Sequence, residues 1–242
     1  MAAVSYVLGA LAGYLVGGIN PSYLIGKIKG FDIRRRGSGN AGASNVAISI
    51  GVAAGIACAL FDIFKAFFAV FLTEHVIFPH LPEAAGLRGN WLAATVGSSC
   101  ILGHVFPPLM GFRGGKGLAC LGGMILAFDW RVFLIMLGIA AVLVAITKYI
   151  CIVPICAAVA FPIVYGVLRA DPVGALIYAV ASVVILCKHL VNIRRICKGT
   201  ELKISSMWKR EEAIDTLKEH LKENTGEVPE EDGGEVPDYL TK

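Results

Sequence analysis

Long apolar runs separated by short polar connections fill most of residues 4–187. The runs lack the strict alternation of apolar and polar residues that marks the strands of a membrane barrel. Because only helices and closed barrels satisfy every backbone hydrogen bond in lipid, the pattern predicts membrane-embedded helices. The seven predicted helices cover Val4–Ile25, Val46–Phe71, Trp91–Phe106, Leu118–Phe128, Val132–Thr147, Tyr149–Leu168 and Val173–Cys187.

One of these runs, Leu118–Phe128, is short for a membrane span. At 1.5 Å per residue it would rise only about 17 Å, whereas a full span needs ~20 residues. We therefore expect this helix to begin earlier, to tilt, or to start from a loop that dips into the membrane. The predicted fold is an all-α integral membrane protein of about seven transmembrane helices, with short half-helices.

Composition supports this class of fold. The 242 residues are 56% hydrophobic and 17% charged, which is too apolar for an ordinary soluble domain. We predict a membrane domain over residues 1–205 and a polar, acidic tail over residues 206–242. A short helix is expected over 206–223, and the Glu-, Asp- and Gly-rich remainder is expected to be disordered. Membrane lipid is an expected partner, and no nucleic-acid partner is expected.

The seven cysteines are an odd number, include no Cys-x-x-Cys pair, and lie mostly in apolar runs. This pattern argues against a disulfide framework and against a zinc site. We interpret the cysteines as small packing residues and predict no metal.

Positive charge is divided unevenly between alternate connections. With the N-terminus outside, twelve Lys and Arg residues fall on the inner side and three on the outer side. The twelve are Lys27, Lys29, Arg34, Arg35, Arg36, Arg113, Lys116, Lys148, Lys188, Arg194, Arg195 and Lys198, and the three are Arg88, Arg131 and Arg169. Because cytoplasmic loops carry the excess of Lys and Arg, we predict an N-out, C-in, multi-pass protein of the plasma membrane.

Two charged residues interrupt the second apolar run. Asp62 and Lys65 are three residues apart and so share one face of a helix. Each ionised group at mid-membrane costs about 2.5–3.5 kcal/mol, so both should face the bundle interior, paired with each other or with a loop. Two interpretations stay open: a structural ion pair that orients the helix, or direct support of a site.

The first of three polar segments on the inner side is rich in glycine and basic residues. Gly37, Gly39 and Gly42 allow backbone N–H groups to turn toward a ligand, with further donors at Ser38, Asn40, Ser44 and Asn45. The segment then runs into a helix N-terminus, which favours an anion. The pattern predicts a phosphate-binding loop, although a basic connector without a ligand would have the same composition.

The second segment ends in Gly114-Gly-Lys-Gly117. It is not a Walker loop, because Lys116 is followed by Gly and not by Ser or Thr, so nucleotide binding is not implied. Glycines around a lysine at the start of a helix favour a second anion site, with Lys116 as the point charge. His104, just upstream, could instead be a helix-end residue bonded to a backbone carbonyl.

The third segment follows the last apolar run. If it is helical, His189 and Asn192 share a face, with Arg195 one turn further on. Basic residues in such a place also serve as anchors for lipid headgroups. All three segments are predicted to lie at the same, cytoplasmic face, which favours one active site built from their loops.

Together these segments resemble the acylphosphate-dependent glycerol-3-phosphate acyltransferases of bacteria, the PlsY family. The resemblance covers about residues 4–205, keeps the order of the family's motifs, and includes Asp62-x-x-Lys65. The family also has seven helices and an outside N-terminus. The motifs are Gly37-Ser-Gly-Asn-x-Gly-Ala-Ser-Asn45, Gly103-His-x-Phe-Pro with Gly114-Gly-Lys-Gly117, and His189-x-x-Asn-Ile-x-Arg-x-x-x-Gly-x-Glu201.

The resemblance implies transfer of a fatty acyl group from acyl phosphate to the 1-hydroxyl of glycerol 3-phosphate, giving lysophosphatidic acid, without a cofactor. It implies catalytic roles for Ser38, Lys116, His189 and Asn192. The residues it implies for substrate binding are Gly39, Asn40, Asn45, Gly114, Gly115, Gly117 and Arg195, and those for structural support are Asp62, Lys65 and Glu201. Arg36, at a position where the chain departs from the family, is also predicted to bind substrate. The sequence does not define the oligomeric state.

The chain departs from the family pattern at three positions. Arg36 stands where the family usually has Ser, Ile48 where it has Arg, and Cys120 where it has Thr. A missing phosphate-binding arginine would remove charge-assisted hydrogen bonds of about 1.5–3 kcal/mol each, unless Arg36 compensates. These departures leave open a divergent paralogue that binds phosphorylated lipid without this activity. The charge pairs alone would also allow a small transporter.

Overall fold

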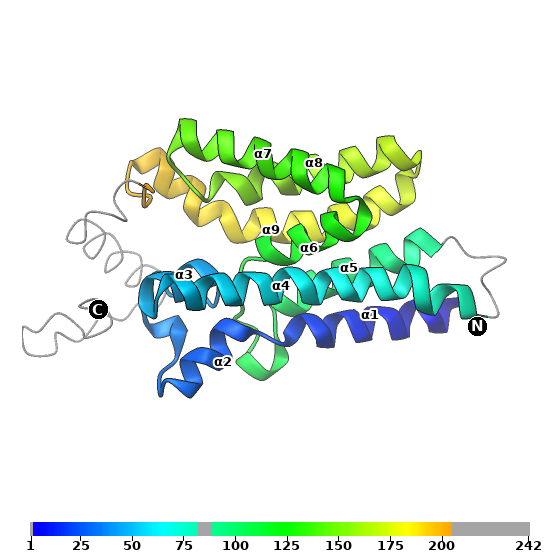
Figure 1. Ribbon diagram of the computed structural model, residues 1–242, viewed down its shortest axis with the longest axis horizontal. Helices are drawn as coiled ribbons and strands as arrows, with labels where there is room; N and C mark the ends of the chain where they lie inside the picture. The colour runs from blue at the N-terminus through cyan, green and yellow to red at the C-terminus, as the bar shows by residue number, and fades with distance from the viewer. Residues whose placement is uncertain (1, 82–88, 205–242) are drawn as a thin grey trace, which may run out of the picture.

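The computed structural model describes residues 2–81 and 89–204, and every regular element within these ranges is helical (Figure 1). The α-helices are α1 (Ala2–Gly18), α2 (Pro21–Ile28), α3 (Ala43–Ser49), α4 (Val52–Leu72), α5 (Gly89–Val105), α6 (Leu118–Phe128), α7 (Trp130–Thr147), α8 (Ile152–Arg169) and α9 (Pro172–Lys198). Short 3-10 or π segments are η1 (Ile33–Arg35), η2 (Thr73–Ile77), η3 (Phe78–His80) and η4 (Pro108–Met110). The tail helix predicted over 206–223 lies outside the described residues.

The described ranges contain six helical segments that are long and apolar enough to cross a membrane. They run along the long axis of the molecule (Figure 1). The segments are Ala3–Ile28, Val52–His80, Trp91–Met110, Trp130–Thr147, Ile152–Arg169 and Pro172–Lys198. The short run predicted at Leu118–Phe128 is α6, an apolar helix of 11 residues with the predicted bounds. The all-α membrane fold is confirmed.

Two of the predicted helices are each broken in two, so their predicted continuity is wrong. The first breaks at Asn20, whose side chain accepts a hydrogen bond from Tyr23 N at 2.8 Å and caps α2, with Pro21 in its first turn. The second breaks at Gly51, whose φ of +144° is accessible to glycine, between α3 and α4. Both breaks lie next to the polar loops.

Glycines allow α1 to approach α5 closely, and α6 to approach α4. A Cβ at Gly17 on α1 would collide with the carbonyl of Cys100 on α5, and one at Gly103 would collide with the carbonyl of Tyr14. In the same way, Gly123 on α6 lies against the carbonyl of Ile63 on α4. Such small-residue contacts are the usual basis of helix association in membranes, where hydrophobic burial gives little driving force.

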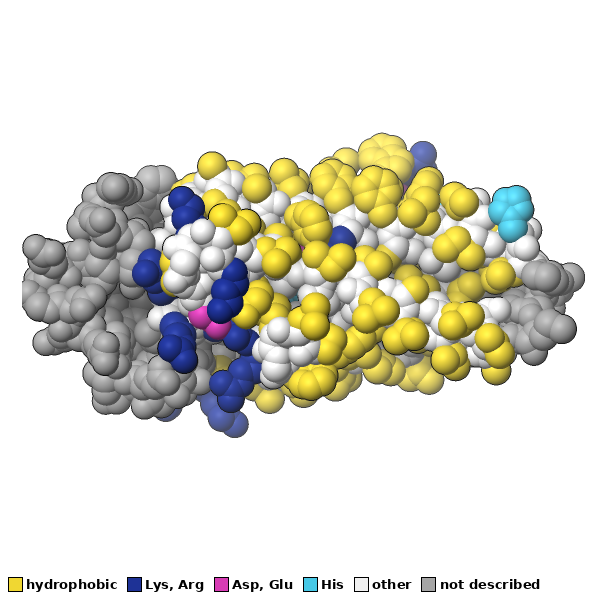
Figure 2. Space-filling view, turned by 90° about the horizontal axis from the view of Figure 1, so that it is seen from below, with side chains coloured by type: hydrophobic (Ala, Val, Ile, Leu, Met, Phe, Trp, Pro, Cys, Tyr) yellow, Lys and Arg dark blue, Asp and Glu magenta, His cyan; other side chains and the backbone are white. Residues whose placement is uncertain are grey.

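The upper layer contains α7, α8 and α9 (Figure 1). α7 has no buried residue within its described length, as expected for a helix that faces lipid. Where α8 meets α9, Phe161, Tyr165 and Tyr178 pack edge to face, with ring centroids 4.8–6.4 Å apart. Most of the Lys and Arg side chains visible in Figure 2 gather at one end of the molecule, beyond an apolar middle.

Asp171 forms a buried polar junction that the sequence analysis missed. It caps α9 by accepting from Gly174 N at 3.1 Å, and its carboxylate also accepts from Trp91 Nε1 at 2.9 Å and Tyr165 OH at 3.1 Å. These bonds tie the start of α9 to α5 and α8. An Asp before a Pro at the start of an apolar run is a recognisable capping signal, but its distant partners are not visible in sequence.

Candidate active site

The first polar loop connects α2 to α3. It turns at Gly37 and Gly39, whose φ angles of +54° and +71° lie in the left-handed region. Ser38 between them and Asn40 after them are half-buried. The loop enters α3, which is only seven residues long, and not the long helix that was predicted.

Asn45 holds this loop in shape from the inside and is 1% exposed. Its Oδ1 accepts from Ser38 N at 2.9 Å. Its Nδ2 donates to the backbone carbonyls of Ile33 (2.9 Å), Arg36 (3.0 Å) and Asn40 (2.9 Å). Asn45 therefore shapes the loop that carries Ser38, while its expected contact with substrate stays a prediction.

The side chains at the two positions in this region that depart from the family pattern have other surroundings. The Arg36 guanidinium stacks over the ring of Phe31, 3.7 Å from its centroid, a cation–π contact. Ile48 is half-buried on α3.

The second polar loop connects α5 to α6 and folds back onto the end of α5. Gly114 N donates to Val105 O and Gly115 N to His104 O, each at 3.1 Å. A side chain at either glycine would collide with its surroundings: with the His104 carbonyl at Gly114, and with His104 Nε2 at Gly115. Gly117, at φ +90°, is the N-cap of α6. Positions 114 and 115 therefore require glycine on steric grounds. Lys116 lies between Gly115 and Gly117, the N-cap of α6.

The third polar segment is the last part of α9, which continues to Lys198, well beyond the Cys187 end that was predicted. His189, Asn192 and Arg195 are all buried on one face of this helix, as their spacing predicted. His189 Nδ1 lies 2.8 Å from Ile185 O, and because a carbonyl only accepts, Nδ1 carries a proton in this contact. α9 ends at Gly199, where φ is +72°.

The second and third segments meet through side chains. Lys116 Nζ donates to Asn192 Oδ1 at 2.6 Å, and Asn192 Nδ2 donates to Glu201 Oε1 at 2.8 Å. Burial lowers the pKa of Lys116 from its ordinary value, and the negative charge of Glu201 acts in the opposite direction. This chain of contacts brings together a cation, an amide and a carboxylate from residues up to 85 positions apart (116 to 201).

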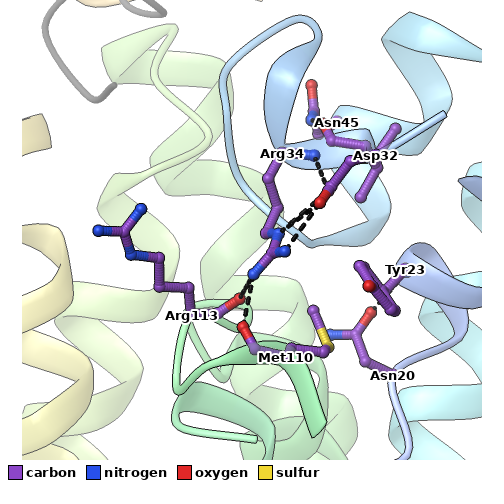
Figure 3. Close-up of polar contacts among 8 residues, drawn as sticks. Asn20, Tyr23, Asp32, Arg34, Asn45, Met110 and Arg113 are labelled. Carbon is purple, nitrogen blue, oxygen red and sulfur yellow. Dashed lines mark hydrogen bonds and ion pairs between the residues drawn. The ribbon is translucent and has the colours of Figure 1, made fainter. Parts of the chain in front are cut away.

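The first and second loops meet through Arg34, which the sequence analysis treated only as a positive charge (Figure 3). Its Nη1 donates to the carbonyls of Met110 at 2.6 Å and Arg113 at 3.2 Å. Asp32 binds the other edge of the guanidinium, with Nη2 2.7 Å from Oδ2. The pKa of Asp32 is lowered chiefly by this hydrogen bonding with Arg34. The signal that could have revealed this pair is Asp-x-Arg directly before the glycine turn.

A separate polar cluster lies inside the helix bundle. Lys65 Nζ forms an ion pair with Asp62 Oδ1 at 2.6 Å, which confirms the predicted pairing on one helix face. His104 Nδ1 lies 3.2 Å from Lys65 Nζ and 3.4 Å from Asp62 Oδ1. His104 thus belongs to this cluster, and the alternative of a bond to a carbonyl is replaced by these side-chain partners.

Two residues of this cluster, together with Cys120, form a group of side chains in the described ranges that could hold a metal ion. Asp62, His104 and Cys120 offer ligand atoms within 4.8 Å of one another. The Lys65 ammonium already lies against Asp62 and supplies the positive charge that a metal would bring. We therefore interpret the cluster as a closed ion-pair network.

The fold and the site define a multi-pass α-helical membrane protein with a basic, glycine-lined polar site at one end of its helices. The sequence profile of the family described as glycerol-3-phosphate acyltransferase matches residues 7–199. The chain therefore belongs to the glycerol-3-phosphate acyltransferase family, and the resemblance stated from the motifs is confirmed.

Individual relatives agree with the family. The chain is 36% identical over 204 residues to the glycerol-3-phosphate acyltransferase of Clostridioides difficile (strain 630), which covers 83% of this chain and 96% of the relative. The fold is similar to the crystal structure of PlsY (YgiH), an integral membrane glycerol 3-phosphate acyltransferase, in its glycerol 3-phosphate form. That similarity has a TM-score of 0.73 at 27% identity and covers 84% of this chain and 97% of the other. The lysophosphatidic acid form of the same enzyme gives a TM-score of 0.70 at 26% identity over 84% of this chain and 98% of the other.

Proposed function

We propose that this protein transfers a fatty acyl group from acyl phosphate to the 1-hydroxyl of glycerol 3-phosphate, producing lysophosphatidic acid. Family membership supports the acyltransferase activity and the acceptor. The observation that carries the proposal is the convergence of Lys116, Asn192 and Glu201 beside a glycine-lined loop. The half-buried ammonium of Lys116 lies next to glycines whose backbone a ligand can approach closely. This combination suits a phosphorylated substrate.

In the proposed reaction the acceptor hydroxyl oxygen attacks the carbonyl carbon of acyl phosphate. The ester bond forms, the bond between the acyl carbon and the phosphate oxygen breaks, and inorganic phosphate leaves with the hydroxyl proton. Acyl phosphate is an activated mixed anhydride, so positioning and charge stabilisation supply most of the catalysis. The chain has no histidine followed by Asp five residues later, so the substrate's own phosphate is the proposed proton acceptor.

We assign roles in this reaction to residues from all three segments. Lys116 and Ser38 would hold phosphate oxygens, and the Gly114–Gly117 loop would receive glycerol 3-phosphate. His189 and Asn192 would line the reacting centre. The contact between His189 Nδ1 and the Ile185 carbonyl fixes the orientation of the ring, and Nε2 is the ring nitrogen that would face the reacting centre. Glu201 would brace the loop after α9 through Asn192.

We also propose that seven helices cross the plasma membrane, N-out and C-in, with the active site at the cytoplasm. The charge asymmetry of twelve basic residues against three supports this orientation. α6 would then be the seventh, short crossing of a membrane domain that extends over residues 1–205. The gathering of Lys and Arg side chains at one end of the molecule agrees with this arrangement (Figure 2).

The second candidate function is a paralogue that binds phosphorylated lipid without acyl transfer. Ile48 favours it, because the family's arginine at this position is missing. If the loss of this arginine has weakened phosphate binding, Ile48→Arg should raise turnover or lower the KM for one substrate. If Arg36 compensates, Ile48→Arg should change little and Arg36→Ser should lower turnover.

The test is turnover by the purified protein in detergent. Glycerol 3-phosphate is offered with palmitoyl phosphate, palmitoyl-CoA or palmitoyl-acyl carrier protein, and phosphate release and lysophosphatidate formation are measured together. Equal amounts of phosphate and lysophosphatidate from acyl phosphate alone would support the proposal. If no product forms under conditions where the Clostridioides difficile relative turns over, the non-catalytic paralogue becomes the better description.

A further inference from the structure

The guanidinium of Arg34 forms hydrogen bonds that connect the first polar loop to the second (Figure 3). We propose that Arg34, held by Asp32, is a positioning residue that sets the spacing of the two phosphate-binding loops and so controls the rate of acyl transfer. This inference rests on the proposed function, because it assumes that one loop carries each phosphorylated group.

The contacts of Arg34 use its planar shape. Nε lies 3.0 Å from Asp32 Oδ1 and Nη2 lies 2.7 Å from Oδ2, a two-pronged contact that fixes the plane of the guanidinium. Nη1 then donates to the carbonyls of Met110 and Arg113. The guanidinium carbon of Arg34 also lies over the ring of Tyr23, 5.1 Å from the ring centroid. The Arg113 side chain points away and takes no part (Figure 3).

These carbonyls lie at the turn that leads directly into the Gly114–Gly117 loop. η1, which carries Arg34, leads on the other side into the turn that holds Ser38. Asn20 Nδ2 donates to Ala41 O at 3.0 Å, and a side chain at Gly115 would approach the same Ala41 carbonyl. The two loops are therefore in contact at Ala41, and Arg34 sets how they are placed along that contact.

Positioning is separable from folding at this site. The side chains of Arg34 and Asp32 are 23% and 17% exposed, so removing one leaves the other in reach of water and not stranded in a dry interior. Displacing one reacting group by about 1 Å can lower the rate of a reaction ~10²-fold. The loss should therefore appear in kcat at saturating concentrations of both substrates, and less in either KM.

The experiment compares Arg34→Ala, Arg34→Lys, Asp32→Asn and the double variant Asp32→Asn/Arg34→Ala. Arg35→Ala is the matched control, because Arg35 is the neighbouring arginine and is exposed. We expect Arg34→Ala to lower kcat by about 10- to 100-fold with a smaller change in each KM. Lysine should rescue little, because it cannot form the two-pronged contact with Asp32. Asp32→Asn should lower kcat in the otherwise native protein and should change kcat very little when Arg34→Ala is already present.

A second measurement does not depend on turnover. Hydrogen–deuterium exchange over residues 107–117 should become faster in Arg34→Ala and stay unchanged in Arg35→Ala, with the thermal midpoint of both variants near that of the native protein. Unchanged kcat and exchange in Arg34→Ala, or equal losses in both arginine variants, would overturn the positioning role. Absence of turnover in the native protein would count against the proposed function, and the exchange result would still decide whether Arg34 orders the loop.

Discussion

Lys65 is buried and Lys116 is half-buried, and the two lysines have different hydrogen-bond partners. Lys65 Nζ donates to the carbonyls of Gly17 at 3.0 Å and Ile19 at 2.7 Å and pairs with Asp62 at 2.6 Å. An ammonium has three donors, and here it is surrounded by these three oxygens and by His104 Nδ1 at 3.2 Å. Lys116 Nζ has a single hydrogen-bond partner, Asn192, among the residues that the structure describes.

This difference separates structural support from a binding site. The charge of Lys65 is balanced within the protein, and its carbonyl partners lie where α1 ends and α2 begins, so it stabilises the junction of two helices. Among the described residues Lys116 uses one donor, and Glu201, whose charge acts on it, bonds to Asn192. We therefore expect the two lysines to fail differently when they are replaced: Lys65 in stability, Lys116 in activity.

The largest effect should come from Lys65→Met. It leaves Asp62, which is 1% exposed, without its counter-charge, and breaking a buried ion pair in this way lowers stability by about 3–5 kcal/mol. The thermal midpoint in detergent and the yield of monodisperse protein measure the loss. The double variant Asp62→Asn/Lys65→Met leaves no unpaired charge and should recover most of it. Equal stability of the native protein and Lys65→Met would show that the pair is dispensable.

The next effect concerns activity. Lys116→Ala should reduce kcat/KM for acyl transfer by about 10²–10³-fold, the usual consequence of removing one charge-stabilising group from an active site. Its thermal midpoint should fall less than that of Lys65→Met, because the lost contact is one hydrogen bond to Asn192 and not a buried ion pair. Lys29→Ala is the control, because Lys29 is an exposed lysine at the C-cap of α2. Retained activity in Lys116→Ala would reassign this lysine to membrane anchoring.

The sequence predicted those parts of the fold that depend on local pattern. Apolar run length defined α6 from Leu118 to Phe128, and helical periodicity placed Asp62 with Lys65 and His189 with Asn192. The breaks at Asn20 and Gly51 were missed because an apolar average across a run hides a single capping residue or glycine. Asn-Pro within the first run was the signal available, since Asn favours an N-cap and Pro a first helical position.

The contacts across the molecule could not be predicted in the same way. Lys116 with Asn192 and Arg34 with Met110 are each separated by 76 positions, and nothing in one segment specifies the other. Asn45 shows a related limit: an amide in a glycine-rich loop suits a ligand as well as it suits three carbonyls of its own loop. The residue types were informative, and their partners depended on helix packing.

The third prediction tests whether the environments of the two lysines are independent. Gly115 separates them: its neighbour in the chain is Lys116, and a side chain there would collide with His104 Nε2 in the Lys65 cluster. Gly115→Ala should therefore disturb both, through overpacking of about 1–3 kcal/mol, lowering the thermal midpoint and kcat together. Gly122→Ala on α6 is the control, because no atom would come closer than 3.6 Å. If Gly115→Ala affects activity alone, the two regions are uncoupled.

The smallest effect is a shift in the pH dependence, and it tests the charge state of Lys116. Burial lowers the pKa of Lys116, and Glu201 partly offsets this by raising it. A lysine with a lowered pKa in the folded state loses its proton at lower pH than an ordinary lysine, so activity that needs the ammonium should fall with rising pH before ordinary lysines titrate.

Glu201→Gln removes the offset, so the alkaline limb of log kcat/KM should move to still lower pH. Folding stability should change in the opposite sense with pH, because the unfolded chain holds the Lys116 proton more tightly and native stability rises as pH passes from the lowered to the ordinary pKa. The measurement is the pH profile of log kcat/KM for the native protein and for Glu201→Gln at equal ionic strength. If the alkaline limb does not move in Glu201→Gln, the titrating group is not Lys116. The positive charge that the active site needs for a phosphorylated substrate would then come from another residue.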